Sequence, residues 1–392
     1  MTAWELASFS PDVLRVDSTA IAELAGAEDA LDGVEVDVVG PGDSVRLTHV
    51  LDAVEPRIRT EGRTNAIAGA AVIACLDFPG EERPLHEQEG LIDLAGPAAA
   101  LTPFAELTNV VLTFRPKDDA GHVAIDEAAR RVTLATAELV AEGTRDGDPE
   151  QVERFELGPA ADDLPRIAAL VQLSDLGSLY TQWVDGVAAG EAGLPAVVEP
   201  WRLLDTLVVC GEYHWAALRN PTIFLQRNEL VRALYREHGE RLAFAGLVLM
   251  RGYEQSADDK WAAAKAAAAL AHGLSADGAI ITTDAGGNSH TDVMLTVRAC
   301  EQAGVRTAVI VAEMADPDST NPGLTDWVPE ADCIVSAGNA EELVSAWAPD
   351  RVLGGDRLLD GTPAAEATPI PVRNYLGATN QMGQLSLTAT TW

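Results

Sequence analysis

The sequence is poor in basic residues. Its 27 lysines and arginines stand against 61 aspartates and glutamates, and the formal net charge is −34. A surface with this charge repels the phosphates of nucleic acids and the headgroups of anionic lipids. We therefore expect neither a nucleic-acid partner nor a membrane partner. Because the acidic residues are spread along the chain, their simplest role is to solubilise the surface.

Cysteine is also scarce, and the usual cysteine motifs are missing. The four cysteines are widely spaced, with no CxxC pair and no disulfide framework: Cys75, Cys210, Cys300 and Cys333. This usage favours a reducing compartment. No apolar run is long enough to cross a membrane, and the first residues lack the basic and apolar regions of a signal peptide. We expect a cytoplasmic protein.

Apolar residues are plentiful, at 47% of 392 positions, which is enough for a globular chain of two or three domains. From residue 242 onward, the sequence alternates between strand and helix patterns. Strands are predicted at 244–250, 278–283, 307–311 and 331–336, and helices at 257–272 and 290–303. This alternation is typical of a parallel sheet with helices on its faces.

The N-terminal part has a more mixed pattern. Strands are predicted at 68–76 and 108–114, an amphipathic helix at 122–141, and a second helical region at 163–200. The predicted fold class is therefore α/β, with a C-terminal parallel-sheet α/β domain and an N-terminal mixed α+β domain.

The stretch 205–215 stands out because a lone cysteine ends an apolar strand pattern. Two valines precede Cys210, and Gly211 permits a sharp turn after it. Glu212 and His214 bring groups that move protons close to the thiol. A buried, inert cysteine is the commoner outcome on local sequence alone. The alternative is a nucleophilic thiol.

Three arginines concentrate positive charge in this acidic protein: Arg46, Arg57 and Arg59. They are candidates to hold a substrate carboxylate, although pairing with nearby acids is the commoner outcome. Thr379 and Asn380, in the polar segment 374–383, either belong to an ordinary loop or donate hydrogen bonds at a site.

The loop 284–292 follows one predicted strand and opens a helix. Its glycines allow a close approach of the backbone to a ligand, but it is neither GxGxxG nor a P-loop, so no nucleotide is implied. Asn288 is a candidate ligand residue, or Asn288 or Ser289 caps the helix.

Four residues of this region also allow a different class of function, a metal-dependent hydrolase: Asp284, His290, Asp292 and Glu313. Their spacing is loose and acidic sequences offer such sets by chance, so we expect no metal.

Several short stretches, in order along nearly the whole chain, resemble the component B proprotein of the glycine, sarcosine and betaine reductases. The matching stretches are 41–46, 54–57, 90–97, 102–104, 208–212, 276–281, 287–292, 337–340 and 377–383. Each is weak alone, but the set is specific.

The resemblance implies that the precursor cleaves itself between Val209 and Cys210, and that Cys210 becomes a pyruvoyl cofactor. The chain would divide into 1–209, similar to a beta subunit, and 210–392, similar to an alpha subunit. The pyruvoyl group would bind a small amine as a Schiff base.

The resemblance also implies a hetero-oligomer with a thiol- or selenol-bearing subunit that cleaves the C–N bond reductively, because this chain has neither selenocysteine nor CxxC. Substrate binding would then involve Arg46, Arg57, Asn288, Thr379 and Asn380. An alternative keeps the fold without the cleavage: a scaffold subunit in which Cys210 is an ordinary thiol.

Overall fold

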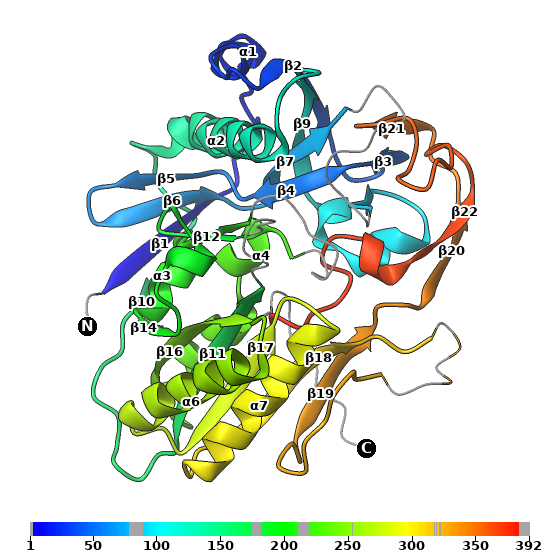
Figure 1. The fold of residues 1–392 in the computed structure, drawn as a ribbon. Helices are drawn as coiled ribbons and strands as arrows, with labels where there is room; N and C mark the ends of the chain where they lie inside the picture. The colour runs from blue at the N-terminus through cyan, green and yellow to red at the C-terminus, as the bar shows by residue number, and fades with distance from the viewer. Residues whose placement is uncertain are drawn as a thin grey trace.

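Two lobes make up the protein, joined by a helix and by a returning C-terminal segment (Figure 1). The structure is a computed structural model that describes residues 3–77, 89–174, 182–210, 220–252, 254–316, 318, 320 and 323–383. The upper lobe is drawn in blue and cyan and the lower lobe in green and yellow (Figure 1). Within the described residues, no helix has the length and apolarity that a membrane span needs.

The lower lobe is built on a six-stranded sheet. Its order is β14 (Ala196–Val198), β16 (Ala243–Gly252), β11 (Arg166–Ser174), β17 (Gly278–Thr283), β18 (Arg306–Glu313) and β19 (Ile334–Asn339). All neighbouring strands are parallel except the edge strand β14, which is antiparallel to β16. The predicted parallel α/β region is therefore confirmed.

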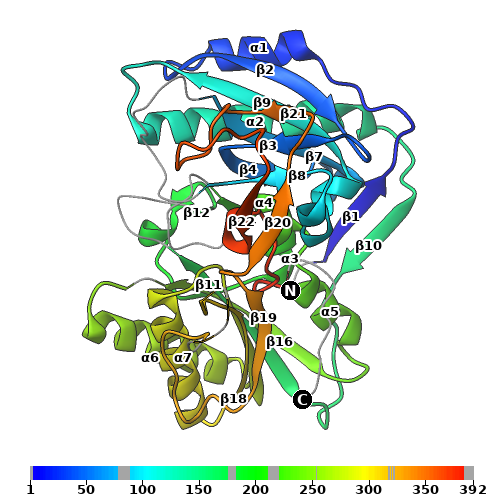
Figure 2. The same cartoon turned by 90° about the vertical axis from the view of Figure 1, so that its right-hand side faces the viewer.

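Helices cover both faces of this sheet (Figure 2). Helices α6 (Ala257–Gly273) and α7 (Asn288–Gln302) pack on one face. Helices α3 (Pro200–Leu204) and α5 (Glu229–Glu237) pack on the other. Both faces of the central strands are consequently withdrawn from water.

Strand β11 corrects the helical region predicted at 163–200. Ala168 and Leu170 face α6 and α7, whereas Ala169 and Val171 face α3 and α5. A strand buried on both faces has a continuous apolar run instead of an alternating one, and periodicity cannot distinguish such a run from a buried helix. The prediction failed because the region supplies the centre of the sheet.

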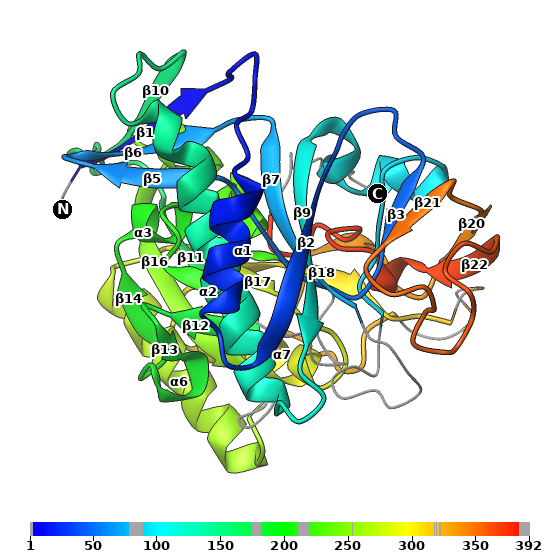
Figure 3. The same cartoon turned by 90° about the horizontal axis from the view of Figure 1, so that it is seen from above.

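The upper lobe contains the sheet β2 (Leu31–Val39), β9 (Thr108–Pro116), β7 (Ala70–Leu76) and β4 (Val50–Val54). Helices α1 (Ser18–Gly26) and α2 (His122–Ala141) cover one face (Figure 3). A second sheet has the order β10 (Gln151–Phe155), β1 (Trp4–Phe9), β6 (Arg63–Ile67) and β5 (Arg57–Thr60). The helix predicted at 122–141 is confirmed at both ends.

Helix α4 (Thr222–Gln226) lies between the lobes (Figure 1). Ile223 and Phe224 belong to the core of the upper lobe, against β7 and β9, and Leu225 belongs to the core that the lower lobe shares with β1 and β10. Consecutive side chains of one short helix therefore pack into two different cores.

The remaining elements are short. One sheet consists of β13 (Val187–Ala188), β12 (Gln182–Val184) and β15 (Val208–Cys210), and another of β21 (Arg351–Leu353), β3 (Val45–Leu47) and β8 (Ile92–Asp93). Strands β20 (Leu343–Trp347) and β22 (Thr368–Pro371) form a pair. The 3-10 helices are Pro97–Leu101, Pro103–Glu106, Glu142–Thr144, Ala189–Glu191 and Val372–Asn374.

Two sheets contain strands from both sides of the 209/210 bond, and in a third sheet the strand β15 spans the bond itself. Strand β11 lies between β16 and β17, β12 pairs with β15, and β3 pairs with β21. The division into 1–209 and 210–392 stays a prediction about the covalent chain. Two pieces divided there would remain interlocked through these sheets.

The tail residue Gly377 has φ 74°, and a Cβ atom there would overlap the ring of Phe224. We expect Gly377→Ala to lower the free energy of unfolding by about 3 kcal/mol, combining left-handed backbone strain with overpacking. Gly361→Ala is the matched control, because φ is 87° there and nothing lies within 4 Å. It should cost only about 1 kcal/mol. Equal losses in urea unfolding would contradict the packing argument.

Candidate functional site

Cys210 is the last residue of β15, where the sequence predicted a strand to end. It is 5% exposed and lies opposite Gln182 of β12. Glu212 and His214, which were predicted to act beside it, lie outside the described residues. The site is therefore built from the elements that pack around the strand.

Two groups of the turn that enters α4 hold Cys210. Its backbone N–H donates to Thr222 Oγ1 at 2.8 Å, and its thiol donates to the carbonyl of Asn220 at 2.9 Å. Burial raises the pKa of the Cys210 thiol, and the Asp52 and Asp284 carboxylates act in the same direction. The group at rest is consequently a protonated thiol whose nitrogen and sulfur are both fixed in place.

Asp52 of β4 continues this network from the upper lobe. Its Oδ2 lies 2.6 Å from Thr222 Oγ1, and its Oδ1 accepts the backbone N–H groups of Thr222 and Ala53, each at 2.8 Å. Burial raises the pKa of Asp52 to about 7, although the hydrogen bonds from Thr222 and Ala53 oppose the shift. Asp52 therefore changes protonation near neutral pH, and the Thr222 hydroxyl links it to the nitrogen of Cys210.

Asp284 reaches the same place from the lower lobe, directly after β17. Asn220 Nδ2 donates to the carbonyl of Asp284 at 3.1 Å, and Gln182 Nε2 donates to its carboxylate. The carboxylate was predicted only as a possible metal ligand. The Asp284 carboxylate instead acts on the Cys210 thiol, so the groups around Cys210 include an acid from each lobe, Asp52 and Asp284.

Sequence reasoning missed Asp52, Asn220, Thr222 and Gln182. A usable signal exists for Asp52, which is a lone acid within the apolar strand Val50–Val54. Such an acid is buried with its strand, and a buried carboxyl group needs partners. No comparable local signal marks the two amides or the hydroxyl.

Arg46 is buried and makes a two-pronged ion pair with Asp93 at 2.8 and 2.9 Å. Tyr375 from the C-terminal tail donates to the same carboxylate at 3.1 Å. Arg46 also donates to the carbonyl of Ala364 at 3.0 Å. The arginine thus has the acidic partner that the sequence allowed for, and its role toward a substrate stays a prediction.

Arg57 is buried in an ion pair with Glu55, and Arg227 shares that carboxylate. Glu55 N–H donates to Gln226 Oε1 at 2.9 Å, and Arg57 Nη2 donates to the Gln226 carbonyl at 3.0 Å. These bonds fix the C-terminal end of α4, while Asp52 fixes its N-terminal residue, Thr222. Arg57 therefore supports the site through α4, and direct substrate binding by Arg57 stays a prediction.

The other predicted substrate residues lie on two separate segments. Asn288 is exposed at the first position of α7, whose N-cap is Gly287, and no side chain makes a cap hydrogen bond there. Thr379 is buried and donates to Gln381 Oε1 at 2.6 Å, while Asn380 is half-buried. Contact of these residues with a substrate stays a prediction.

The four residues considered for a metal do not form a ligand set. Asp292 pairs with Lys260 at 2.9 Å, and His290 Nδ1 accepts the N–H of Thr325 at 3.2 Å. Glu313 accepts a bond from Ser336. In the part of the chain that the structure describes, no three His, Cys, Asp or Glu residues are grouped to bind a metal ion.

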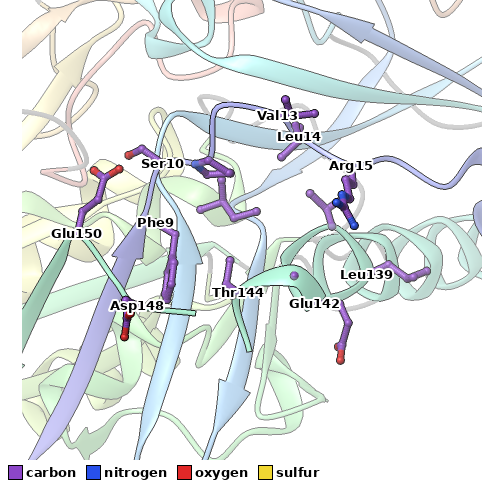
Figure 4. Close-up of a pocket in the computed structure, with 14 residues that line it drawn as sticks. Phe9, Ser10, Val13, Leu14, Arg15, Leu139, Glu142, Thr144, Asp148 and Glu150 are labelled. Carbon is purple, nitrogen blue, oxygen red and sulfur yellow. The ribbon is translucent and has the colours of Figure 1, made fainter. Parts of the chain in front are cut away.

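A surface pocket of about 660 Å³ lies between the end of β1 and the C-terminal end of α2 (Figure 4). Phe9 and Leu14 line it together with Glu142 and Asp148. None of the residues around Cys210 contributes to it. The pocket is therefore separate from the candidate site.

Comparisons with known proteins support the resemblance seen in the sequence. A family model described as glycine/sarcosine/betaine reductase component B subunits matches residues 4–374. The sarcosine reductase complex component B subunit alpha of Peptoclostridium acidaminophilum is 30% identical over 366 residues, covering 87% of this chain and 84% of that protein.

Two further relatives extend over most of the chain. The glycine reductase complex component B subunits alpha and beta of Acetoanaerobium sticklandii is 28% identical, covering 97% of this chain and 94% of that protein. The betaine reductase complex component B subunit alpha of Peptoclostridium acidaminophilum is 27% identical, covering 92% of each. No solved structure matches the chain.

We expect Glu55→Gln to lower the free energy of unfolding by about 3 kcal/mol at neutral pH, because it removes the carboxylate that pairs directly with the buried Arg57. Burial raises the pKa of Glu55, but Arg227 and Arg57 lower it further, to about 2. The stabilisation is thus complete above the ordinary value of 4.5 and is lost as the pH falls toward 2. Urea unfolding at pH 7 and pH 3 measures both effects.

The matched control is Glu142→Gln, which removes an exposed pair with Arg145 and should change stability little. A loss as small as that of the control, or a loss that does not shrink at pH 3, would contradict the expectation for Glu55.

Proposed function

Because the chain belongs to the family of glycine/sarcosine/betaine reductase component B subunits, we propose that it is the self-cleaving, pyruvoyl-forming subunit of a reductase complex that acts on a small amine. The observation that carries the proposal is that two hydrogen bonds fix the reacting atoms of Cys210. Thr222 holds its nitrogen, and Asn220 holds its sulfur. Both atoms must be placed for a thiol to attack its own preceding carbonyl, that of Val209.

The proposed conversion uses only the chain and water. Attack by sulfur on the Val209 carbonyl gives a thioester, and loss of the Cα proton then breaks the Cβ–S bond. Water replaces the nitrogen of residue 210 and releases it as ammonia. A second water removes the sulfur from the Val209 carboxyl group as sulfide. The products are a carboxylate at residue 209 and a ketone at residue 210, and no external oxidant or reductant is needed.

The residues around Cys210 fit a pyruvoyl group. A hydroxyl both accepts and donates hydrogen bonds, so Thr222 can accept the N–H of the precursor and donate to the ketone oxygen that replaces the nitrogen. The burial of Cys210 limits the access of bulk water, so hydration competes less with an amine for a reactive carbonyl there. When present, a pyruvoyl group supplies an electrophilic carbonyl that binds a small amine covalently and weakens its C–N bond.

Reductive cleavage of a C–N bond requires two electrons, and this chain has neither selenocysteine nor a CxxC pair to supply them. We propose that a partner subunit with a reactive thiol or selenol supplies them, in a hetero-oligomer. The relatives are named as components of glycine, sarcosine and betaine reductase complexes, which agrees with this arrangement.

A second candidate function is an unprocessed scaffold subunit of such a complex. The observation that favours it is the burial of Cys210 together with a raised thiol pKa. Both are also typical of a cysteine that serves only packing.

Denaturing mass spectrometry of the protein purified from its native host separates the two candidates. We expect two masses, for 1–209 and 210–392, with borohydride adding two hydrogens to the second. The denatured protein should titrate three thiols, because Cys210 has lost its sulfur and three of the four cysteines remain. Native gel filtration should show a single particle, since two sheets contain strands from both pieces.

The control is Cys210→Ala, which should keep one mass and also titrate three thiols. A native chain with a single full-length mass and four thiols would overturn the proposed function and support the scaffold.

A further inference from the structure

We propose that Thr222 and Asp52 form the proton path that completes cleavage at Cys210, with Thr222 protonating the departing nitrogen and Asp52 resupplying Thr222. The inference rests on the proposed self-cleavage and identifies its acid. It concerns the precursor before any cofactor exists.

The geometry places this path at the reacting atom. Thr222 Oγ1 lies 2.8 Å from the nitrogen of Cys210 and 2.6 Å from Oδ2 of Asp52. Thr222 is fully buried and Asp52 is 5% exposed, so bulk water does not compete for either contact. Thr222 touches the reacting nitrogen and is a catalytic residue, whereas Asp52 acts through it as a positioning residue.

The proton is needed because an amide nitrogen is a poor leaving group until it is protonated. The thiol of Cys210 loses its proton to solvent, and its sulfur bonds to the carbonyl carbon of Val209. The C–N bond then breaks with its electron pair on the nitrogen, which is now pyramidal and can invert toward Thr222. The nitrogen takes the hydroxyl proton of Thr222.

Thr222 takes the carboxylic proton of Asp52 in turn, and Asp52 regains one from solvent. One proton leaves and one returns, and no electron is transferred. The products are a thioester on Val209 and a free amino group on residue 210.

Asp52 is suited to the role because burial raises its pKa to about 7, so it holds a proton near neutral pH. The charged and titratable groups around it in the described part of the chain are Asp126 and Arg130 of α2 and the thiol of Cys210. Asp126 favours the protonated form of Asp52. The hydrogen bonds from Thr222 then direct the acid toward the nitrogen of Cys210.

Cleavage can be followed by cell-free synthesis of the full chain, with denaturing mass spectrometry at intervals. We expect Thr222→Val, which keeps the shape and loses the hydroxyl, to slow division about 100-fold or more, as expected for loss of a general acid. Thr222→Ser should divide within about threefold of the wild-type rate, because it restores the hydroxyl. Hydroxylamine, which cuts thioesters, should release little fragment from Thr222→Val if the first acyl shift is blocked.

Asp52→Asn provides a readout that a purely structural role would not change. We expect it to divide about 10- to 100-fold more slowly below pH 7. The ratio of the wild-type rate to the Asp52→Asn rate should fall as pH rises through 7, because the wild-type acid loses its proton there. Far-UV circular dichroism and urea midpoints verify folding, and if Thr222→Val does not fold, the pH ratio decides.

Division of folded Thr222→Val at the wild-type rate, or a ratio that does not depend on pH, would overturn this inference while leaving the proposed function intact. A wild-type chain that never divides would overturn both.

Discussion

The hydrogen bonds between Asp52 and Thr222 are the contacts on which the arrangement around Cys210 depends. Asp52 belongs to a strand of the upper sheet, and Thr222 begins a helix whose next residues enter the cores of both lobes. The same hydroxyl receives the N–H of Cys210. A buried carboxyl group that lost these bonds would keep the N–H of Ala53 but lose both bonds from Thr222, at considerable cost. The position of the start of the helix, and of the peptide bond before Cys210, therefore depends on this acid.

Arg46 and Arg57, which the sequence suggested as ligand-binding residues, hold the C-terminal tail and helix α4 in place. Tyr375 of the tail donates a hydrogen bond to Asp93, the partner of Arg46, and Gly377 of the tail packs closely against the ring of Phe224. Glu55 and Arg57 hold the other end of the helix. Arg46 and Arg57, each paired with an acid, thus also join segments that lie far apart in the sequence, through bonds to the carbonyls of Ala364 and Gln226. Support of this kind is rigid because each donor has a specific acceptor.

Local pattern was sufficient wherever a segment had a helical period or a bounded apolar run. The helix at 122–141 and the strand at 278–283 were predicted with their observed bounds. It was insufficient for β11, whose burial on two faces removes the alternation that identifies a strand. The residues next to Cys210 predicted that a strand ends there, but no local sequence pattern identifies Thr222 and Asn220 as residues of the site. Their importance comes from the segments that tertiary structure places next to them.

The central position of β11 has a consequence for timing under the proposed function. This strand is made before Cys210 during synthesis, yet it pairs on both sides with strands made after it. Asp52 likewise precedes its partner Thr222 by 170 residues. Under that proposal, an unfinished or misassembled chain would lack the contacts around Cys210, so its backbone would stay uncut. Cleavage would then depend on complete folding, so that only a correctly assembled protein would acquire a reactive carbonyl.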